Sequence, residues 1–164
     1  PAAVSRAIGA VLFELARVSE SAPGSPRALE LISCLAEGAD RLAAHEILGL
    51  PAGVLRALLP LEPDDYEIDF PSRESRLDFR FLMDAAASRH VVPVAESREA
   101  AYRAAGCHAV DACDILLAVW DGRPGRGAGG TSAIVAYGRE KHKPLIIIDS
   151  VNPRQVTRER LWGT

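Results

Sequence analysis

The segment from Asp114 to Thr131 constrains the fold most, because it reads as an apolar strand, a glycine-rich loop and the start of a helix. Residues 115–120 form a near-continuous apolar run, typical of a parallel strand buried on both faces. A strand, a glycine turn and a helix in this order bring free backbone N–H groups and the positive end of a helix dipole to one place. The segment therefore predicts a cradle for an anionic group such as a phosphate.

A second turn of the same kind is expected upstream, at residues 31–40. Leu31 to Ser33 ends an apolar run, Gly38 follows in a short turn, and a helical pattern begins after it. Two such turns in one chain favour a single nucleotide-sized pocket.

Apolar runs alternate with helical patterns along the rest of the chain, which is typical of βαβ units. We predict an α/β fold with a Rossmann-like parallel sheet and helices on both faces, in one domain spanning residues 1–164. The expected helices are at about 4–15, 38–50, 74–88, from Ser97 onward and after the glycine-rich loop; the expected strands are at about 29–33, 54–59, 91–95, 115–120 and 145–148; residues 60–71 are expected to be a loop.

The first predicted element is a helix, although doubly wound folds usually begin with a central strand. We therefore expect that the N-terminal strand of the fold lies upstream of Pro1 and that the sequence is a fragment lacking it.

Composition excludes several classes of function. Of the 164 residues, 48% are hydrophobic and 25% charged, as in an ordinary globular domain with one core. No apolar run approaches the roughly 20 residues that span a bilayer, so we expect a cytoplasmic protein without a membrane partner. A net charge of −3 argues against a nucleic-acid coat. The three cysteines and four histidines show no ligand spacing, so no metal and no cofactor are expected.

Four segments carry a resemblance to a known family: residues 32–45, 59–70, 102–106 and 114–131. Together they resemble the SLOG superfamily of Rossmann-like domains. That superfamily includes DNA-processing protein A, the Lonely Guy phosphoribohydrolases, and domains of melastatin-type channels and bacterial Thoeris defence effectors. Members similar to this chain usually begin with a strand ending in a Gly-His-Arg turn, which this sequence lacks.

The resemblance implies a pocket for a nucleotide-derived ligand, ADP-ribose or a cyclic relative, at the carboxyl ends of the strands. It also implies an effector domain or partner protein that the ligand regulates, and a homo-oligomer. Open α/β sheets in general bind ligands at this edge.

Several residues would bind the phosphate groups. The backbones of Gly129, Gly130 and Thr131 would donate N–H groups, because a side chain at the glycines would block close approach. Gly38 would do the same at the upstream turn, and the Ser33 hydroxyl would donate a hydrogen bond. The alternative is that both glycine segments are ordinary tight turns.

Other residues would bind the ribose and the base. Glu37 and Asp40 suit ribose hydroxyls or an exocyclic amine, because ionised carboxylates only accept hydrogen bonds; Asp40 would equally suit the positive end of a helix dipole. Tyr66 would cover a base while the acids around it stay mostly solvated; the alternative is that this segment is simply a solvated loop. Trp120 would stack on a base beside Asp121, or else simply cap the core.

Position 134 separates a sensor from an enzyme. The related phosphoribohydrolases carry a catalytic glutamate after their glycine-rich motif, and this chain has Ile134 there. Isoleucine transfers no proton, so we predict a binding domain without catalytic residues. A phosphoribohydrolase that uses another carboxylate is the alternative, and single-stranded DNA binding like that of DNA-processing protein A is the second alternative.

Overall fold

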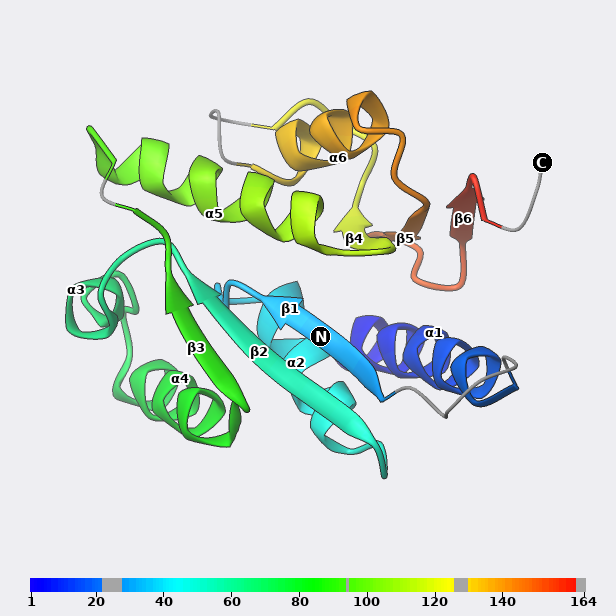
Figure 1. Cartoon of the computed structure of the whole chain (residues 1–164), viewed down its shortest axis with the longest axis horizontal. Helices are drawn as coiled ribbons and strands as arrows, with labels where there is room; N and C mark the ends of the chain where they lie inside the picture. Colours follow the sequence, from blue (N-terminus) through cyan, green and yellow to red (C-terminus); the bar gives the residue numbers. More distant parts are fainter. Residues whose placement is uncertain (22–27, 94, 126–129, 162–164) are drawn as a thin grey trace.

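The computed structural model describes residues 1–21, 28–93, 95–125 and 130–161. Its helices and strands alternate along most of the chain, so the predicted α/β class is confirmed (Figure 1). In chain order they are α1 (Ala2–Ser21), β1 (Leu29–Ser33), α2 (Ala39–Leu48), β2 (Gly53–Leu59), α3 (Pro63–Glu67), α4 (Arg73–Ala85), β3 (Ser88–Val91), α5 (Arg98–Ala112), β4 (Leu116–Trp120), α6 (Thr131–Glu140), β5 (Leu145–Asp149) and β6 (Val156–Glu159).

The strands form two three-stranded sheets, where the sequence predicted one. In the first sheet β2 pairs in parallel with β1 and β3, with Leu31 opposite Leu55. In the second, β5 pairs in parallel with β4 and antiparallel with β6. The two sheets are separate because β1 and β4, the strands at their adjacent edges, do not pair with each other among the described residues.

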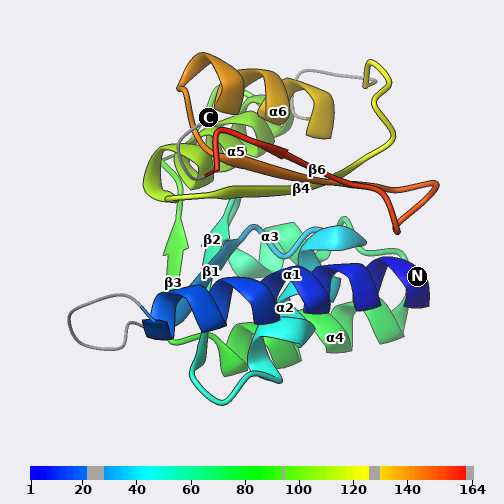
Figure 2. The same cartoon turned by 90° about the vertical axis from the view of Figure 1, so that its right-hand side faces the viewer.

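Helices cover the two sides of the strands. In Figure 2, α1, α2 and α4 lie on one side, and α5 and α6 lie on the other. Helix α1 contacts both β1 and β5, so it spans the junction between the sheets. Ile8 of α1, Leu55 of β2 and Ile148 of β5 accordingly belong to one buried apolar cluster. Burial of this cluster is the main source of stability for the whole arrangement.

Two expectations around residues 60–71 and 88–95 are wrong. Residues 60–71 contain the helix α3, which begins with a proline at its first position and buries Tyr66. The strand expected at 91–95 is β3 (Ser88–Val91), and α4 ends before it at Ala85. Within the described part of the chain this strand pairs with β2 alone, and its first three residues are exposed, so it lacks the apolar run that marks a buried strand.

Strand β6 is absent from the sequence-based expectations. Its four residues, Val-Thr-Arg-Glu, are mostly polar. Ion pairs from its last two residues fix it to the helices, because Arg158 contacts Glu14 of α1 and Glu159 contacts Arg139 of α6. An antiparallel edge strand on a parallel sheet is common in α/β proteins.

Candidate functional site

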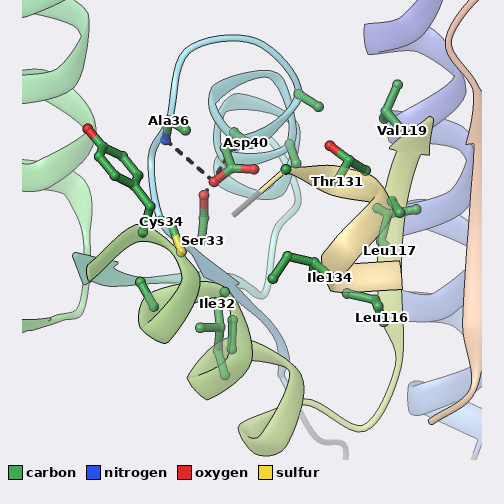
Figure 3. A pocket seen from close by; sticks show the side chains of 18 of the residues that line it. Ile32, Ser33, Cys34, Ala36, Asp40, Leu116, Leu117, Val119, Thr131 and Ile134 are labelled. Atoms are coloured by element: carbon green, nitrogen blue, oxygen red, sulfur yellow. Dashed lines mark hydrogen bonds between the residues drawn. The ribbon is translucent and has the colours of Figure 1, made fainter. Parts of the chain in front are cut away.

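A cavity of about 350 Å³ opens at the carboxyl ends of β1 and β4. One wall follows β1 into α2, with Ser33 and Asp40, and the facing wall contains Thr131 and Ile134 of α6 (Figure 3). The cavity brings together Ser33, Glu37, Asp40, Tyr66, Gly130 and Thr131 of the ten predicted site residues. Its volume lies within the range of small-molecule sites.

The hydroxyl of Ser33 holds the turn after β1. It accepts a hydrogen bond from the backbone N–H of Leu35 at 3.1 Å and donates one to the backbone oxygen of Asp40 at 3.3 Å. Leu35 itself has a φ of 56°, in the left-handed region that non-glycine residues rarely adopt. Ser33 is therefore at the predicted site, but its hydroxyl is used to shape the backbone.

Gly38 precedes α2 with a φ of 98° and a ψ of −126°. No described atom lies within 4 Å of the place where a Cβ would stand, so this position needs glycine for its backbone angles and not for space. Gly38 lines a second cavity beside the first, together with Pro1, Val4 and Glu37.

Asp40 lies in the first turn of α2, and its half-buried carboxylate accepts the N–H of Ala36 at 3.4 Å. Desolvation raises the pKa of this carboxyl group, although hydrogen bonds from the backbones of Ala36 and Cys34 oppose the shift. Asp40 therefore keeps its proton to higher pH than a solvent-exposed aspartate does.

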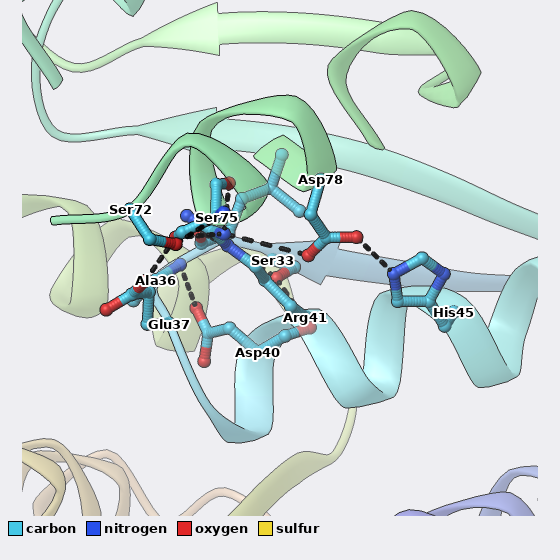
Figure 4. Close-up of polar contacts among 10 residues, drawn as sticks. Ser33, Ala36, Glu37, Asp40, Arg41, His45, Ser72, Ser75 and Asp78 are labelled. Carbon is cyan, nitrogen blue, oxygen red and sulfur yellow. Dashed lines mark hydrogen bonds and ion pairs between the residues drawn. The ribbon is translucent and has the colours of Figure 1, made fainter. Parts of the chain in front are cut away.

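Arg41 is a buried cation beside the site, and no role was predicted for it from the sequence (Figure 4). Its Nε donates to the oxygen of Leu35 at 3.0 Å, and its Nη1 donates to the oxygen of Ser75 at 2.7 Å. The guanidinium also lies 4.1 Å from the centre of the Phe70 ring. Arg41 thus joins the turn after β1 to α4, and the hydroxyl of Ser75 bonds Glu37 in turn. A cation in the first turn of a helix is disfavoured by the positive end of the helix dipole. The position of Arg41 in the sequence therefore indicates that specific partners compensate for this.

Tyr66 lines the cavity from α3 and is 1% exposed. The rings of Phe70, Phe79 and Tyr102 meet it edge-on, with centroids 4.9, 5.5 and 5.7 Å away. Burial raises the pKa of the phenol, so it stays protonated. Its hydroxyl has no hydrogen-bond partner among the described residues, which is rare for a buried polar group.

Of the four acids around Tyr66, Asp64, Asp65 and Asp69 are exposed as expected, whereas Glu67 is buried. Three of the four form ion pairs that the sequence did not predict. Arg98 contacts both Asp65 and Asp69 at 3.0 Å, and Arg80 contacts Glu67 at 2.8 Å. These pairs hold α3 against α4 and α5.

The N-terminus of α6 faces the cavity at Gly130 and Thr131. Among the described residues, no side chain caps this helix, so its first N–H groups keep their capacity for an anion. Gly129 lies outside the described residues. The same holds for the rest of 126–129, so the predicted cradle is described only from Gly130 onward.

Trp120 and Asp121 do not line the cavity. The Trp120 indole N–H donates to the oxygen of Arg123 at 2.8 Å, and the ring packs against the small apolar cluster around Val135. Asp121 accepts the N–H of Arg123 at 3.0 Å. These contacts agree with the alternative in which Trp120 caps the core.

No family model matches the chain, and a search of curated proteins found no match. Within the described residues, no helix has the length and apolar character needed to cross a membrane.

Proposed function

We propose that this protein binds a nucleotide-derived ligand, of the ADP-ribose type or a cyclic relative, in the cavity at the carboxyl ends of β1 and β4. Binding regulates an effector domain or partner protein. The proposal includes a Rossmann-like, doubly wound arrangement, in which the ligand lies where the helices switch from one side of the strands to the other. The resemblance to the SLOG superfamily supports the same ligand class.

The unpartnered hydroxyl of Tyr66 carries the proposal. A buried phenol without a partner is destabilising by about 1–3 kcal/mol, and a ligand acceptor in the cavity removes that cost. The uncapped N-terminus of α6 on the same cavity favours an anionic group there. One neutral donor and one helix N-terminus around an apolar interior suit a ligand with both a phosphate and a ring.

Different polar groups of the cavity suit different parts of the ligand. Phosphate fits the N–H groups at Gly130 and Thr131, whereas Asp40 and Glu37 on the opposite wall suit hydroxyl or amine donors. Two carboxylates near a phosphate would repel it, so the sugar or base belongs on their side.

One observation favours a second candidate, a phosphoribohydrolase. Asp40 has a raised pKa and lines the cavity, as a general acid for glycosidic bond cleavage does. Against this candidate, the position of the family's glutamate is occupied by Ile134, whose side chain packs on Gly106 of α5.

The test is titration calorimetry with ADP-ribose on the Tyr66→Phe variant, which removes only the hydroxyl. A lost hydrogen bond to a ligand acceptor predicts affinity about 10-fold lower, or up to 100-fold if the acceptor is charged. Tyr137→Phe is the matched control, because the Tyr137 hydroxyl bonds Asp111 and does not line the cavity. Equal affinity of Tyr66→Phe and the unmodified protein would remove Tyr66 from the site.

A further inference from the structure

The two sheets present unpaired edges to each other. In the part of the chain that the structure describes, β1 pairs with β2 alone and β4 pairs with β5 alone. Alternate residues of a strand direct their N–H and C=O groups to opposite sides. Half of the backbone groups of β1 and β4 therefore point into the space between them, where buried groups need partners.

That space is a continuous slot. The site cavity extends into its upper part, toward the carboxyl ends of the strands, and a second cavity of about 690 Å³ occupies its lower part, toward their amino ends. Leu31, Ile32, Leu116 and Leu117 line both cavities, so the slot follows β1 and β4 along their length.

Helices cover both sides of the slot. Ile8 and Leu15 of α1 line it on one side, and Ala105 and Ala109 of α5 line it on the other. Most of the lining residues are apolar, as is usual around a parallel strand buried on both faces. A slot with a strand edge on either side and a helix on each face is shaped for one extended segment.

The strands that border the slot run in the same direction. Leu29 and Ile115, at or beside the amino ends of β1 and β4, line the lower cavity, whereas Ser33 and Val119, at their carboxyl ends, line the upper one. One added strand is therefore able to pair in parallel with both.

The position of α1 indicates how such a strand connects. Pro1 and Val4 line a cavity with Gly38 and Val119, so α1 begins beside the carboxyl ends of β1 and β4. A parallel strand in the slot ends at this place and leads directly into α1, which then returns the chain to β1. The β1–α2–β2 unit also moves one strand toward β3, and its helix α2 packs beside α1 on the same side of the strands. The unit formed by the added strand, α1 and β1 therefore has the same handedness as β1–α2–β2.

We propose that the full-length protein contains a further β-strand, joined directly to Pro1, that fills this slot and merges the two sheets into one. The strand order is then β3, β2, β1, the added strand, β4, β5 and β6. The added strand fills only the part of the site cavity that lies between β1 and β4. The part lined by Asp40, Tyr66 and Thr131 lies beyond the strands and stays open to the ligand. A strand from another molecule fits less well, because α1 and α5 cover the slot on both faces.

The test is backbone hydrogen exchange, measured by NMR without nucleotide, on the natural full-length protein and on the 164-residue chain. We expect amides in Leu29–Ser33 and Leu116–Trp120 to exchange at least about tenfold more slowly in the full-length protein, together with protected amides directly ahead of Pro1. Strand β2, which is paired on both sides, is the internal control.

Equal exchange of these amides in the two proteins would overturn the proposal. Protection that appears only as the protein dimerises, followed by sedimentation at several concentrations, would also overturn it, because a second copy would then supply the strand. This proposal does not depend on the ligand: exchange without nucleotide tests the strand, and calorimetry tests the binding.

Discussion

Gly106 of α5 faces Ile134 of α6 so closely that a Cβ on Gly106 would lie 2.5 Å from Cδ1 of Ile134. Ile134 is thus a helix-packing residue in this protein. Both residues also line the cavity, so their contact sets the spacing of α5 and α6 at this wall of the cavity.

This contact predicts energetic coupling between the two positions. Alanine in place of a helical glycine is stabilising by about 0.5–1 kcal/mol when space allows. We expect Gly106→Ala to show no such gain in the unmodified protein and to show it in the Ile134→Ala background, where the space is free. Urea unfolding of the two single variants and the double variant measures the coupling. Strictly additive effects would contradict the close contact.

The turn after β1 depends on Ser33. Ser33→Ala leaves the N–H of Leu35 without its acceptor, and Leu35 is fully buried. We expect the free energy of unfolding to fall by about 1–3 kcal/mol. Ser88→Ala serves as the control in the same denaturation experiment, because the Ser88 hydroxyl makes only an exposed bond with Arg56. A Ser33 variant as stable as the control would show that the turn forms without the hydroxyl.

The raised pKa of Asp40 makes a prediction about pH. In the folded state this carboxyl group keeps its proton to higher pH than in the unfolded state, where its pKa is near 3.8. Ionisation therefore removes stability as the pH rises from about 3.8 through the folded-state pKa. We expect Asp40→Asn to gain stability relative to the unmodified protein across that window, measured by thermal unfolding at stepped pH.

Asp149→Asn is the control of opposite sign. Backbone N–H groups of Asn152 and Val151 lower the pKa of Asp149, so its ionised form contributes stability above the unfolded pKa and loses it as the pH falls. The two variants should diverge from the unmodified protein in opposite directions at neutral pH. Parallel curves would be inconsistent with a desolvated Asp40.

The N-terminus of α6 offers a charge test. Asp and Ser both cap helices well at the position that Gly130 occupies, so neither substitution should unfold α6. Gly130→Asp also places a carboxylate where the ligand's phosphate is expected. We predict that calorimetry detects no ADP-ribose binding to Gly130→Asp, while Gly130→Ser keeps measurable affinity. Normal binding by the aspartate variant would remove the α6 N-terminus from the site.

Local patterns in the sequence predicted the elements near the site. The apolar runs at Leu29–Ser33 and Leu145–Asp149 and the glycine before α2 mark two strands and a helix start without reference to the rest of the chain. Six predicted residues line one cavity because the carboxyl ends of β1 and β4 lie at the same edge of the molecule.

Long-range contacts explain what the sequence did not predict. Arg41 is bonded to Ser75, 34 residues away, so its burial follows from how α2 packs on α4. Tyr66 lies in a segment rich in acids, and the arginines that pair those acids come from α4 and α5. The separation of the two sheets depends on which strands pair, and no local pattern encodes that choice.

One-dimensional proton NMR of AMP, ADP-ribose and cyclic ADP-ribose, each mixed with the protein, tests the central claim most directly. The account predicts selective line broadening of at least one nucleotide without new signals, and loss of that broadening in Gly130→Asp. New ribose-phosphate or free-base signals would mean that the protein is a hydrolase despite Ile134. Unchanged spectra for all three compounds would contradict the claim that the cavity binds a nucleotide of this class.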